Sequence, residues 1–448
     1  MSVKRYTREE LGLQKVSLPF VKRPELLMPA GNVETFNTGL KYGADAIYIG
    51  GEMYSLRAKA TNFSKEEMKE CIKKAKSLGK KVYVTANITA HNNDLQGIRD
   101  YFTELHNFND DEKPNALIIS DPGVFMLAKE LCPEIERHIS TQANNVNYST
   151  CKFWYDLGAT RVVTGRELSL EEIAEIKRNI PNDLEVECFI HGAMCISYSG
   201  RCLLSNYFTG RDANLGACTH PCRWKYYVSE KSSDGPSEND FLYIEEEKRK
   251  GEFLPVYEND RGTYIFNSKD LCMIKYVDKM IEAGIDSFKI EGRMKTALYV
   301  ATVARAYRMA IDDFFENPLL YEANIPFYEA ELFKCTYRQY TTGFYFGKPN
   351  EEAQIYDNNV YERNAVYYGF PYAIENNRAL MEQKNKFYVG EEVEILKADG
   401  SSVYSVVESI QNEEGEEMDS CPHAKQKISV RFSKKPDVGD IIRSLTTD

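Results

Sequence analysis

The sequence predicts an α/β protein whose larger part is a closed (β/α)8 barrel of the TIM-like type, followed by a small all-β domain. Two observations support this fold class. From residue 24 onward, short apolar runs alternate with helical patterns, and eight such runs precede residue 292. The turn after the first run, Met28-Pro29-Ala30-Gly31-Asn32, lacks the G-x-G-x-x-G pattern that commonly opens a doubly wound sheet.

Each expected strand is followed by a turn and most by a helical pattern. Ser64 with Glu67 three residues later forms a capping box, and Gly79 is a typical helix stop. A helix is also expected to begin at Ser268 and run to Gly284. The expected strands are 25–30, 46–50, 81–88, 116–120, 138–143, 161–164, 184–191 and 287–291, and the clearest helices are 33–42, 64–78, 123–131, 148–157 and 170–179.

The chain divides into three parts. Residues 1–23 form a basic N-terminal arm, and residues 24–322 form the barrel. The interval between the seventh and eighth strands is far longer than usual, which predicts a cysteine-rich insertion over 195–265. Strand-like alternation returns near the C-terminus, so we expect a β-rich domain over 323–448. Barrel enzymes place their chemistry at the C-terminal ends of the strands, and the insertion is expected on that face.

Composition points to a soluble, cytoplasmic protein without membrane contact. The 448 residues are 43% hydrophobic and 28% charged. No apolar run approaches the roughly 18 residues that span a bilayer, and the N-terminus lacks an apolar segment followed by a cleavage site. Because the net charge is -12, binding of a polyanion requires a local basic patch.

Four cysteines predict a metal centre in the insertion. The chain has eleven cysteines, an odd number, which argues against a disulfide framework. Four of them follow the spacing C-x6-C-x15-C-x3-C among glycines: Cys195, Cys202, Cys218 and Cys222. Thiolates this close in sequence suit a soft metal. Four-thiolate zinc would be structural, whereas an iron–sulfur cluster could handle electrons, and the spacing does not choose between them.

The strand ends predict a polar pocket beside this centre. Side chains alternate along a strand, and helices outside the barrel pack on its apolar face, so the polar face should line the lumen and its upper mouth. This reasoning assigns Glu187 and His191 to the mouth from the seventh strand, and Glu291 and Arg293 from the eighth. The loops and other strand ends add Arg57, Asn87, Gln142 and Arg166.

The quoted residues resemble peptidase family U32, the collagenase-like proteases. Its signature E-x-F-x2-G-[SA]-[LIVM]-C-x4-G-x-C-x-[LIVM]-S is met at every position from Glu187 to Ser205. The resemblance continues in E-L-L-M-P-A-G, R-A-K-A-T-N-F, N-S-K-D-L and K-I-E-G-R. Within the family, the chain looks most like the branch that takes part in tRNA hydroxylation.

This resemblance implies a function and a cofactor. The branch takes part in making 5-hydroxyuridine at the wobble position of the tRNA anticodon loop, in a route that depends on prephenate. It implies a four-iron four-sulfur cluster on Cys195, Cys202, Cys218 and Cys222, with Cys272 as an alternative fourth ligand. A paralogous partner protein is a further expectation. In this reading, His191, Glu187, Glu291 and Arg293 are the candidate catalytic residues, and Arg57, Asn87, Gln142 and Arg166 bind substrate.

Two rival functions remain open from the residues alone. The family name suggests a peptidase, in which His191 with Glu187 would act as a base. However, the sequence contains no H-E-x-x-H, G-x-S-x-G or P-loop motif. The other rival is a noncatalytic RNA-binding scaffold that is stabilised by zinc or by a cluster.

Overall fold

The computed structural model describes most of the chain. The described residues are 3–51, 62–194, 204–209, 219, 221, 224, 226–230, 242–246, 253–256, 258–259, 262–263, 269–347, 364–423 and 425–445. Cys195, Cys202, Cys218, Cys222 and Arg57 lie outside these residues.

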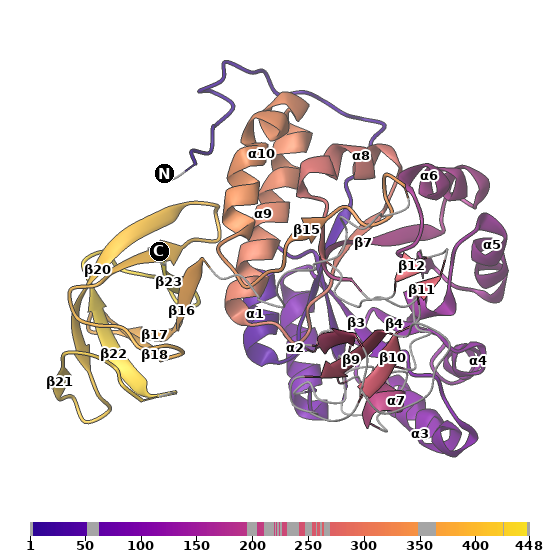
Figure 1. Ribbon diagram of the computed structural model, residues 1–448, viewed down its shortest axis with the longest axis horizontal. Coiled ribbons are helices and arrows are strands. Elements are labelled where there is room, and N and C mark those ends of the chain that lie inside the picture. Colours follow the sequence, from indigo (N-terminus) through magenta and orange to yellow (C-terminus); the bar gives the residue numbers. More distant parts are fainter. Residues whose placement is uncertain are drawn as a thin grey trace.

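The predicted barrel is confirmed, because all eight expected strands are present and run parallel around a closed circle (Figure 1). Each strand pairs with the next along the chain, and β14 pairs with both β1 and β7, which closes the barrel. The strands are β1 (Glu25–Pro29), β2 (Ala46–Gly50), β3 (Lys81–Ala86), β4 (Ala116–Ile119), β5 (Glu136–Ile139), β6 (Arg161–Val163), β7 (Glu185–Ala193) and β14 (Ser287–Ile290).

Helices surround the barrel and bury their apolar faces against it (Figure 1). The predicted capping box is present: Ser64 accepts from the backbone of Glu67, whose side chain accepts from the Ser64 backbone. The helices are α1 (Val33–Lys41), α2 (Lys65–Ser77), α3 (Leu95–His106), α4 (Pro122–Leu131), α5 (Tyr148–Leu157), α6 (Leu170–Asn179), α8 (Val277–Glu282), α9 (Ala297–Glu316) and α10 (Pro318–Leu332), with 3-10 turns η1 (Asn92–Asp94), η2 (Thr141–Ala143) and η5 (Ile274–Tyr276).

One expected helix is wrong in its first half. Ser268 lies outside the described residues, and Asp270–Cys272 forms strand β13 instead of a helical turn. This strand pairs antiparallel with the end of β7, with Cys272 opposite His191, and β15 (Tyr340–Thr341) pairs with its other edge. The backbone groups at the end of β7 need partners, and β13 supplies them. Helix α8 begins only at Val277.

The C-terminal part is an antiparallel β domain, as predicted, but the helical region extends beyond the expected boundary. Residue 323 falls inside α10, β15 still belongs to the barrel sheet, and the new sheet begins with β16. Its strand order is β16-β23-β19-β20-β22-β18-β17, with β21 on β20. The strands are β16 (Ala365–Gly369), β17 (Pro371–Glu375), β18 (Arg378–Glu382), β19 (Glu392–Leu396), β20 (Ser402–Gln411), β21 (Glu417–Met418), β22 (Lys427–Phe432) and β23 (Ile441–Leu445).

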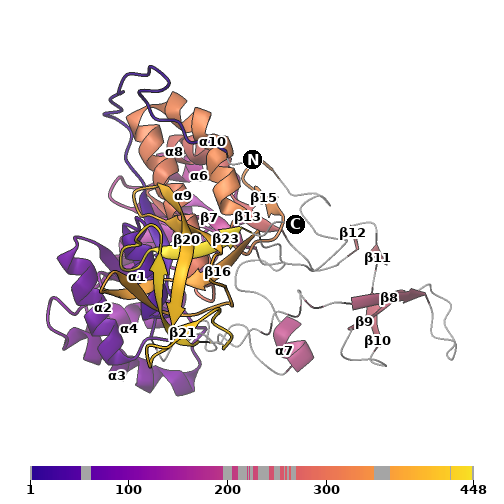
Figure 2. The same ribbon diagram turned by 90° about the vertical axis from the view of Figure 1, so that its left-hand side faces the viewer.

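This domain packs beside α1 and α9 through buried polar contacts (Figures 1 and 2). Glu331 of α10 binds Arg305 at 2.7 Å and Arg443 of β23 at 3.1 Å. Tyr42 donates a hydrogen bond to the Leu396 carbonyl and accepts one from the Ile441 N–H. These buried charges are paired across the domain junction, which fixes how the two parts fit together.

The basic N-terminal arm lies along α9 and along the end of the barrel at which the strands begin. Arg5 binds Asp313 at 2.7 Å, and Lys22 binds Glu185 and Asp286, both at 2.9 Å. The arm therefore uses much of its positive charge within the protein.

The described pieces of the expected insertion are a short helix and several strands. Strands β8 (Tyr226–Glu230), β9 (Leu242–Glu246) and β10 (Phe253–Val256) form an antiparallel sheet, and β11 (Glu258–Asn259) pairs with β12 (Gly262–Thr263). With helix α7 (Leu204–Thr209), they lie to one side of the barrel (Figure 2). Among the described residues, no helix is long and apolar enough to cross a membrane.

Candidate active site at the barrel mouth

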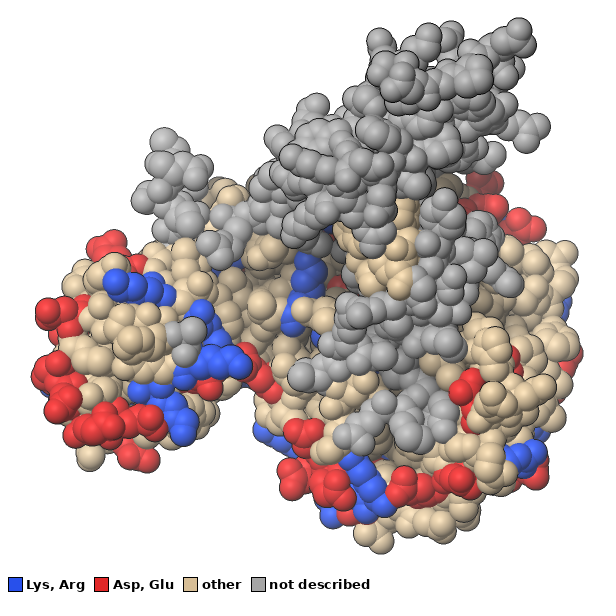
Figure 3. All heavy atoms as spheres, turned by 60° about the horizontal axis from the view of Figure 1, so that its bottom comes forward, with Lys and Arg blue, Asp and Glu red and all other residues tan. Residues whose placement is uncertain are grey.

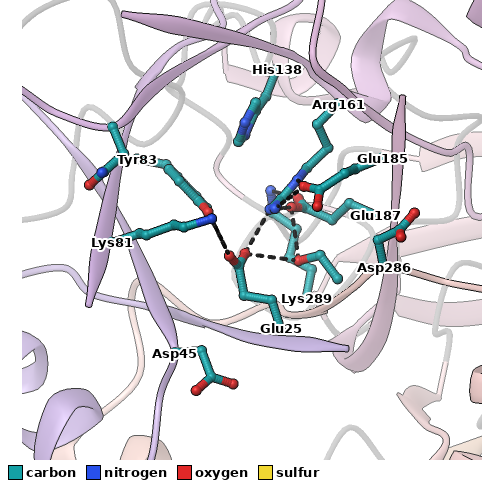
Figure 4. A network of polar contacts seen from close by, with 12 residues as sticks. Glu25, Asp45, Lys81, Tyr83, His138, Arg161, Glu185, Glu187, Asp286 and Lys289 are labelled. Carbon is teal, nitrogen blue, oxygen red and sulfur yellow. Dashed lines mark hydrogen bonds and ion pairs between the residues drawn. The ribbon is translucent and has the colours of Figure 1, made fainter. Parts of the chain in front are cut away.

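A network of paired charges fills the part of the lumen nearer the N-terminal ends of the strands (Figure 4). We call it the lower layer, and its members are Glu25, Arg161, Glu185, Glu187 and Lys289. Glu187 of β7 lies at its centre and is fully buried. Its carboxylate accepts from Lys289 at 2.6 Å and from Arg161 at 2.9 Å. Arg161 also binds Glu25 at 2.7 Å and Glu185 at 2.6 Å. Each of these charges therefore has an opposite charge in contact.

The network holds Glu187 in its ionised form. Burial alone raises the pKa of Glu187, but the charges of Lys289 and Arg161 outweigh burial and lower that pKa to about 2. His138 lies beside the network, and burial together with the charge of Arg161 lowers its pKa. A carboxylate with so low a pKa is a poor proton acceptor near neutral pH. Glu187 is therefore placed to support the floor of the site.

Above the lower layer, the C-terminal ends of the strands enclose a cavity of about 90 Å³, which we call the mouth cavity. Among the described residues, its lining carries the positive groups of Arg166, Lys289 and Arg293 and one carboxylate, that of Glu291. The described residues that line it are Tyr48, Thr85, Asn87, Ile118, Ser140, Thr141, Gln142, Val163, Arg166, Phe189, Lys289, Glu291 and Arg293. The excess of positive charge favours an anionic ligand.

Arg166 is the side chain best placed to bind such a ligand. It follows β6, and its guanidinium lies 4.0 Å above the ring of Phe189. Nη1 donates to the Ala193 carbonyl at 2.8 Å, and Nη2 lies 3.7 Å from Glu291 Oε2. Nε is buried and makes no hydrogen bond to the described residues. A buried donor of this kind has a free-energy cost unless a ligand or water completes it.

Two glycines allow the strand ends to approach closely at the mouth. A Cβ on Gly31 would lie 2.1 Å from the carbonyl oxygen of Arg293, which no side chain tolerates. Gly192 has φ +106°, and a Cβ there would lie 2.5 Å from the Glu291 carbonyl oxygen. These contacts set the backbone positions of Glu291 and Arg293.

Most of the predicted mouth residues do come together. Asn87, Gln142, Arg166, Glu291 and Arg293 all line the mouth cavity. Asn87 Nδ2 lies 3.5 Å from Gln142 Oε1. Glu187 lies one layer below the cavity and contacts it through Lys289.

His191 does not lie where the alternation of β7 placed it, so its expected position is wrong. The pairing of β7 with β14 shifts by one residue between Phe189 and His191, as in a β-bulge. This shift turns His191 out of the lumen and against tyrosines behind the barrel. Its Nδ1 lies 3.4 Å from the Tyr307 hydroxyl, and its ring packs against Tyr299 and Tyr340. Burial, followed by the charge of Lys295, lowers the pKa of His191 to about 3.

Several cavity residues were absent from the predicted set. Thr85 stands two residues before Asn87 and therefore shares its face, a signal that alternation could have supplied. Its hydroxyl accepts from Arg293 Nη1 at 3.3 Å. Thr141 lies in a 3-10 turn that Ser140 caps, because the strand expected over residues 138–143 ends at Ile139. Nothing in the sequence pattern distinguishes that turn from a continuing strand.

The described neighbours of the four predicted metal cysteines contact one another. Thr219, which directly follows Cys218, donates from its N–H to Ser205 Oγ at 3.0 Å, and Ser205 follows Cys202 by three residues. Trp224 donates from Nε1 to the Thr219 carbonyl at 3.3 Å. The alternative ligand Cys272 lies 3.9 Å from the Tyr307 hydroxyl, and burial raises its thiol pKa to about 12.

The chain is similar to known proteins over most of its length. Residues 31–355 match peptidase family U32, and residues 363–443 match the family's C-terminal domain. The tRNA hydroxylation protein P of Escherichia coli is 40% identical over 432 residues, covering 89% of this chain and 92% of that protein. The tRNA hydroxylation protein P1 of Bacillus subtilis is 38% identical over 416 residues, covering 92% and 93%. An uncharacterized protease of Methanocaldococcus jannaschii is 40% identical over 330 residues, covering 73% and 74%.

The fold and the polar mouth define a (β/α)8-barrel protein with an appended β domain. The chain belongs to the peptidase U32 family, which confirms the resemblance seen in the sequence. The relatives from Escherichia coli and Bacillus subtilis are both named tRNA hydroxylation proteins.

Proposed function

We propose that this protein is a tRNA-modifying enzyme, or the substrate-binding part of one, that takes part in 5-hydroxylation of the wobble uridine. The observation that carries the proposal is the extent of the similarity. About nine tenths of this chain aligns with about nine tenths of the Escherichia coli and Bacillus subtilis tRNA hydroxylation proteins. The similarity therefore includes the barrel and most of the β domain, so it does not rest on a shared fold alone.

The mouth cavity supports an organic acid as one ligand, and prephenate is the candidate that we propose. Arginine pairs both oxygens of a carboxylate with its planar fork. Arg166 has a buried Nε without a hydrogen-bond partner among the described residues, and Arg293 lines the same cavity. Asn87, Gln142 and Thr141 add neutral hydrogen-bonding groups around these charges.

Cys195, Cys202, Cys218 and Cys222 are the proposed ligands of a four-iron four-sulfur cluster. Four thiolates suit such a cluster, and they also suit structural zinc. The hydrogen bond between Thr219 and Ser205 supports the proposal, because it joins the chain next to Cys218 with the chain next to Cys202. A bound cluster would supply electron transfer or electrostatic tuning. Iron, sulfide and zinc analysis of anaerobically purified protein separates the two metals.

The proposed macromolecular partner is the anticodon loop of tRNA, whose unpaired bases can be splayed out toward a protein pocket. The chain carries a net charge of -12, so a polyanion needs a local basic surface. On the face shown in Figure 3, several Lys and Arg side chains lie where the C-terminal domain faces the barrel, with a few Asp and Glu beside them. Reconstitution with purified components would show whether a paralogous partner protein is also required.

The structure does not favour the peptidase reading of the family name. That reading used His191 as a base beside Glu187. His191 lies behind the barrel wall with a pKa near 3, and Glu187 is locked between Lys289 and Arg161. The two side chains therefore lie on opposite sides of β7.

The proposal is tested by measuring wobble 5-hydroxyuridine in tRNA. The gene would be expressed in a bacterial strain that lacks its own tRNA hydroxylation protein P but keeps its other U32 proteins, and digested tRNA would be analysed by mass spectrometry. We expect the modified nucleoside to appear with the wild-type protein and to be absent with the empty vector. Protein that accumulates at normal levels with no hydroxyuridine in either strain would remove the proposal and favour a noncatalytic scaffold.

A further inference from the structure

A second and larger cavity lies outside the barrel wall, between α10 and strands β13 and β15. We call it the aromatic cavity, and its volume is about 420 Å³. Its lining is Cys272, Ile274, Lys275, Tyr276, Glu329, Leu332, Phe333, Tyr337, Gln339, Tyr340, Thr341 and Thr342. Pockets of this size with mostly apolar walls and a few polar groups commonly bind small planar molecules.

Four aromatic rings form the walls of this cavity. Tyr337 and Tyr340 are stacked, with ring centres 5.2 Å apart and planes 25° apart. Phe333 packs edge-on against Tyr337 at 4.9 Å. Tyr276 also lines the cavity, and its ring packs against that of Phe346 at 4.6 Å. Such walls offer flat apolar faces on which another ring can stack.

Polar groups at the rim can recognise the edge of that ring. Gln339 is exposed, and its side-chain amide makes no hydrogen bond to the described residues, so both donor and acceptor are available. Thr341 and Thr342 add hydroxyl groups. Lys275 is paired with Glu329 at 2.7 Å and half exposed. Cys272 contributes a neutral thiol.

The aromatic cavity adjoins the barrel mouth. Its strand β13 pairs with Gly192 and Ala193 of β7, and the Ala193 carbonyl binds Arg166 of the mouth cavity. The ring of His191 lies 5.4 Å from that of Tyr340, so His191 forms part of the wall behind the aromatic cavity. The two cavities therefore lie on opposite sides of the last residues of one strand.

We propose that the aromatic cavity binds a nucleobase, supplied by an unpaired residue of the tRNA loop next to the base presented at the barrel mouth. This inference rests on the proposed function. Unpaired bases bind proteins by stacking on aromatic side chains and by hydrogen bonds along their edges, and the cavity has both features. An RNA loop contacting the rim of the barrel at β7 would meet both cavities.

The test combines a protein change with an RNA change. Tyr276→Leu keeps an apolar side chain but removes the stacking face, and Tyr372→Leu, at an exposed tyrosine of β17, is the matched control. Binding would be measured with an anticodon stem–loop RNA and with the same RNA lacking the base on one side of the wobble uridine. Because stacking of one base contributes about 5- to 150-fold in affinity, we expect Tyr276→Leu to weaken binding of the intact RNA by such a factor.

The combination decides whether the base occupies this cavity. Removing the base next to the wobble uridine should weaken RNA binding by the wild-type protein but should change the affinity of Tyr276→Leu little. Gln339→Ala should change which base is preferred at that position of the RNA. The inference would be overturned if, whichever loop base is removed, the wild-type protein and Tyr276→Leu lose equal affinity for the RNA. Absence of any RNA binding would also overturn it. If Tyr276→Leu weakens only the binding of free nucleoside monophosphates, the cavity serves a small molecule and the RNA assignment fails. If any of these contrary results is found while wild-type tRNA hydroxylation is still measured, the proposed function remains and only the nucleobase assignment fails.

Discussion

The lower layer and the mouth cavity are built from the same strands and the same kinds of side chain, yet they differ in how their charges are satisfied. In the lower layer, Glu187 is in contact with both Lys289 and Arg161 and has no exposed surface. In the mouth cavity, Arg166 contacts Glu291 only at 3.7 Å and keeps a buried Nε without a described partner. The distance along a strand between the two levels is only two residues.

This difference shows how a barrel divides its polar residues between folding and binding. Buried charges that are fully paired hold the strands together, and removing one partner exposes the cost of burying the other. Charges that are only partly paired carry part of that cost in the unliganded protein and are relieved by a ligand of opposite charge. The pairing of a charge is therefore a better guide to its role than its residue type.

The strongest test of this comparison is Glu187→Gln. The change leaves Lys289 buried without its carboxylate and removes one of the three carboxylates around Arg161. Loss of one partner of a buried pair typically costs about 3–5 kcal/mol, so we expect the free energy of unfolding to fall by that amount. Urea unfolding monitored by circular dichroism would measure it.

Glu130→Gln serves as the control, because Glu130 is exposed on α4. Its free energy of unfolding should stay within about 0.5 kcal/mol of the wild-type value. A loss below about 1 kcal/mol for Glu187→Gln would contradict the view that Lys289 and Arg161 depend on Glu187 for their charge pairing.

The matching test at the mouth is Arg166→Lys, which keeps the charge but removes the planar fork. A hydrogen bond to a charged group contributes about 1.5–3 kcal/mol, which corresponds to a loss of roughly 10- to 150-fold in tRNA hydroxylation at limiting substrate. We expect stability to change much less than in Glu187→Gln. Mass spectrometry of tRNA and urea unfolding of the same variant would measure the two effects.

Arg178→Lys on the exposed outer helix α6 is the control for Arg166→Lys. It should leave hydroxylation unchanged. Equal activity of the Arg166→Lys variant and wild type would show that Arg166 does not bind the reacting ligand.

The comparison also explains what the sequence could predict. Regular alternation was enough to find the eight strands and to bring Asn87, Gln142, Arg166, Glu291 and Arg293 to one end of the lumen. It also placed Glu187 and Lys289 inside. It could not show that Glu187 is fully paired whereas Arg166 is only partly paired, because pairing depends on partners such as Arg161 from distant strands.

Irregular backbone was the main source of error. Strict alternation of side chains along a strand does not predict the bulge in β7. Because of this bulge, His191 lies on the outer side of the barrel wall and not at the mouth. Asp270–Cys272 forms a strand because the end of β7 offers an unpaired edge, a tertiary effect that overrides local helical signals. The aromatic cavity was missed because the described residues of its walls come from four separate elements, β13, η5, α10 and β15.

The last test, which has the smallest expected effect, concerns His191. Along β7, Glu187 lies in the lower layer, Phe189 lines the mouth cavity and His191 lies behind the barrel wall. An unfolded histidine has a pKa of about 6.5, whereas that of folded His191 is about 3. Between these values the unfolded state binds more protons, so the free energy of unfolding falls as the pH falls. From pH 7 to pH 5, His191 alone should lower the free energy of unfolding by about 2 kcal/mol.

His191→Gln should lack this part of the loss, whereas His91→Gln, at an exposed position, should retain it. Most carboxylates titrate below this window, and the lowered pKa of His138 affects all three proteins alike. Urea unfolding at the two pH values gives the comparison, and equal pH dependence of wild type and His191→Gln would mean that His191 is accessible to protons, as a residue of the mouth would be.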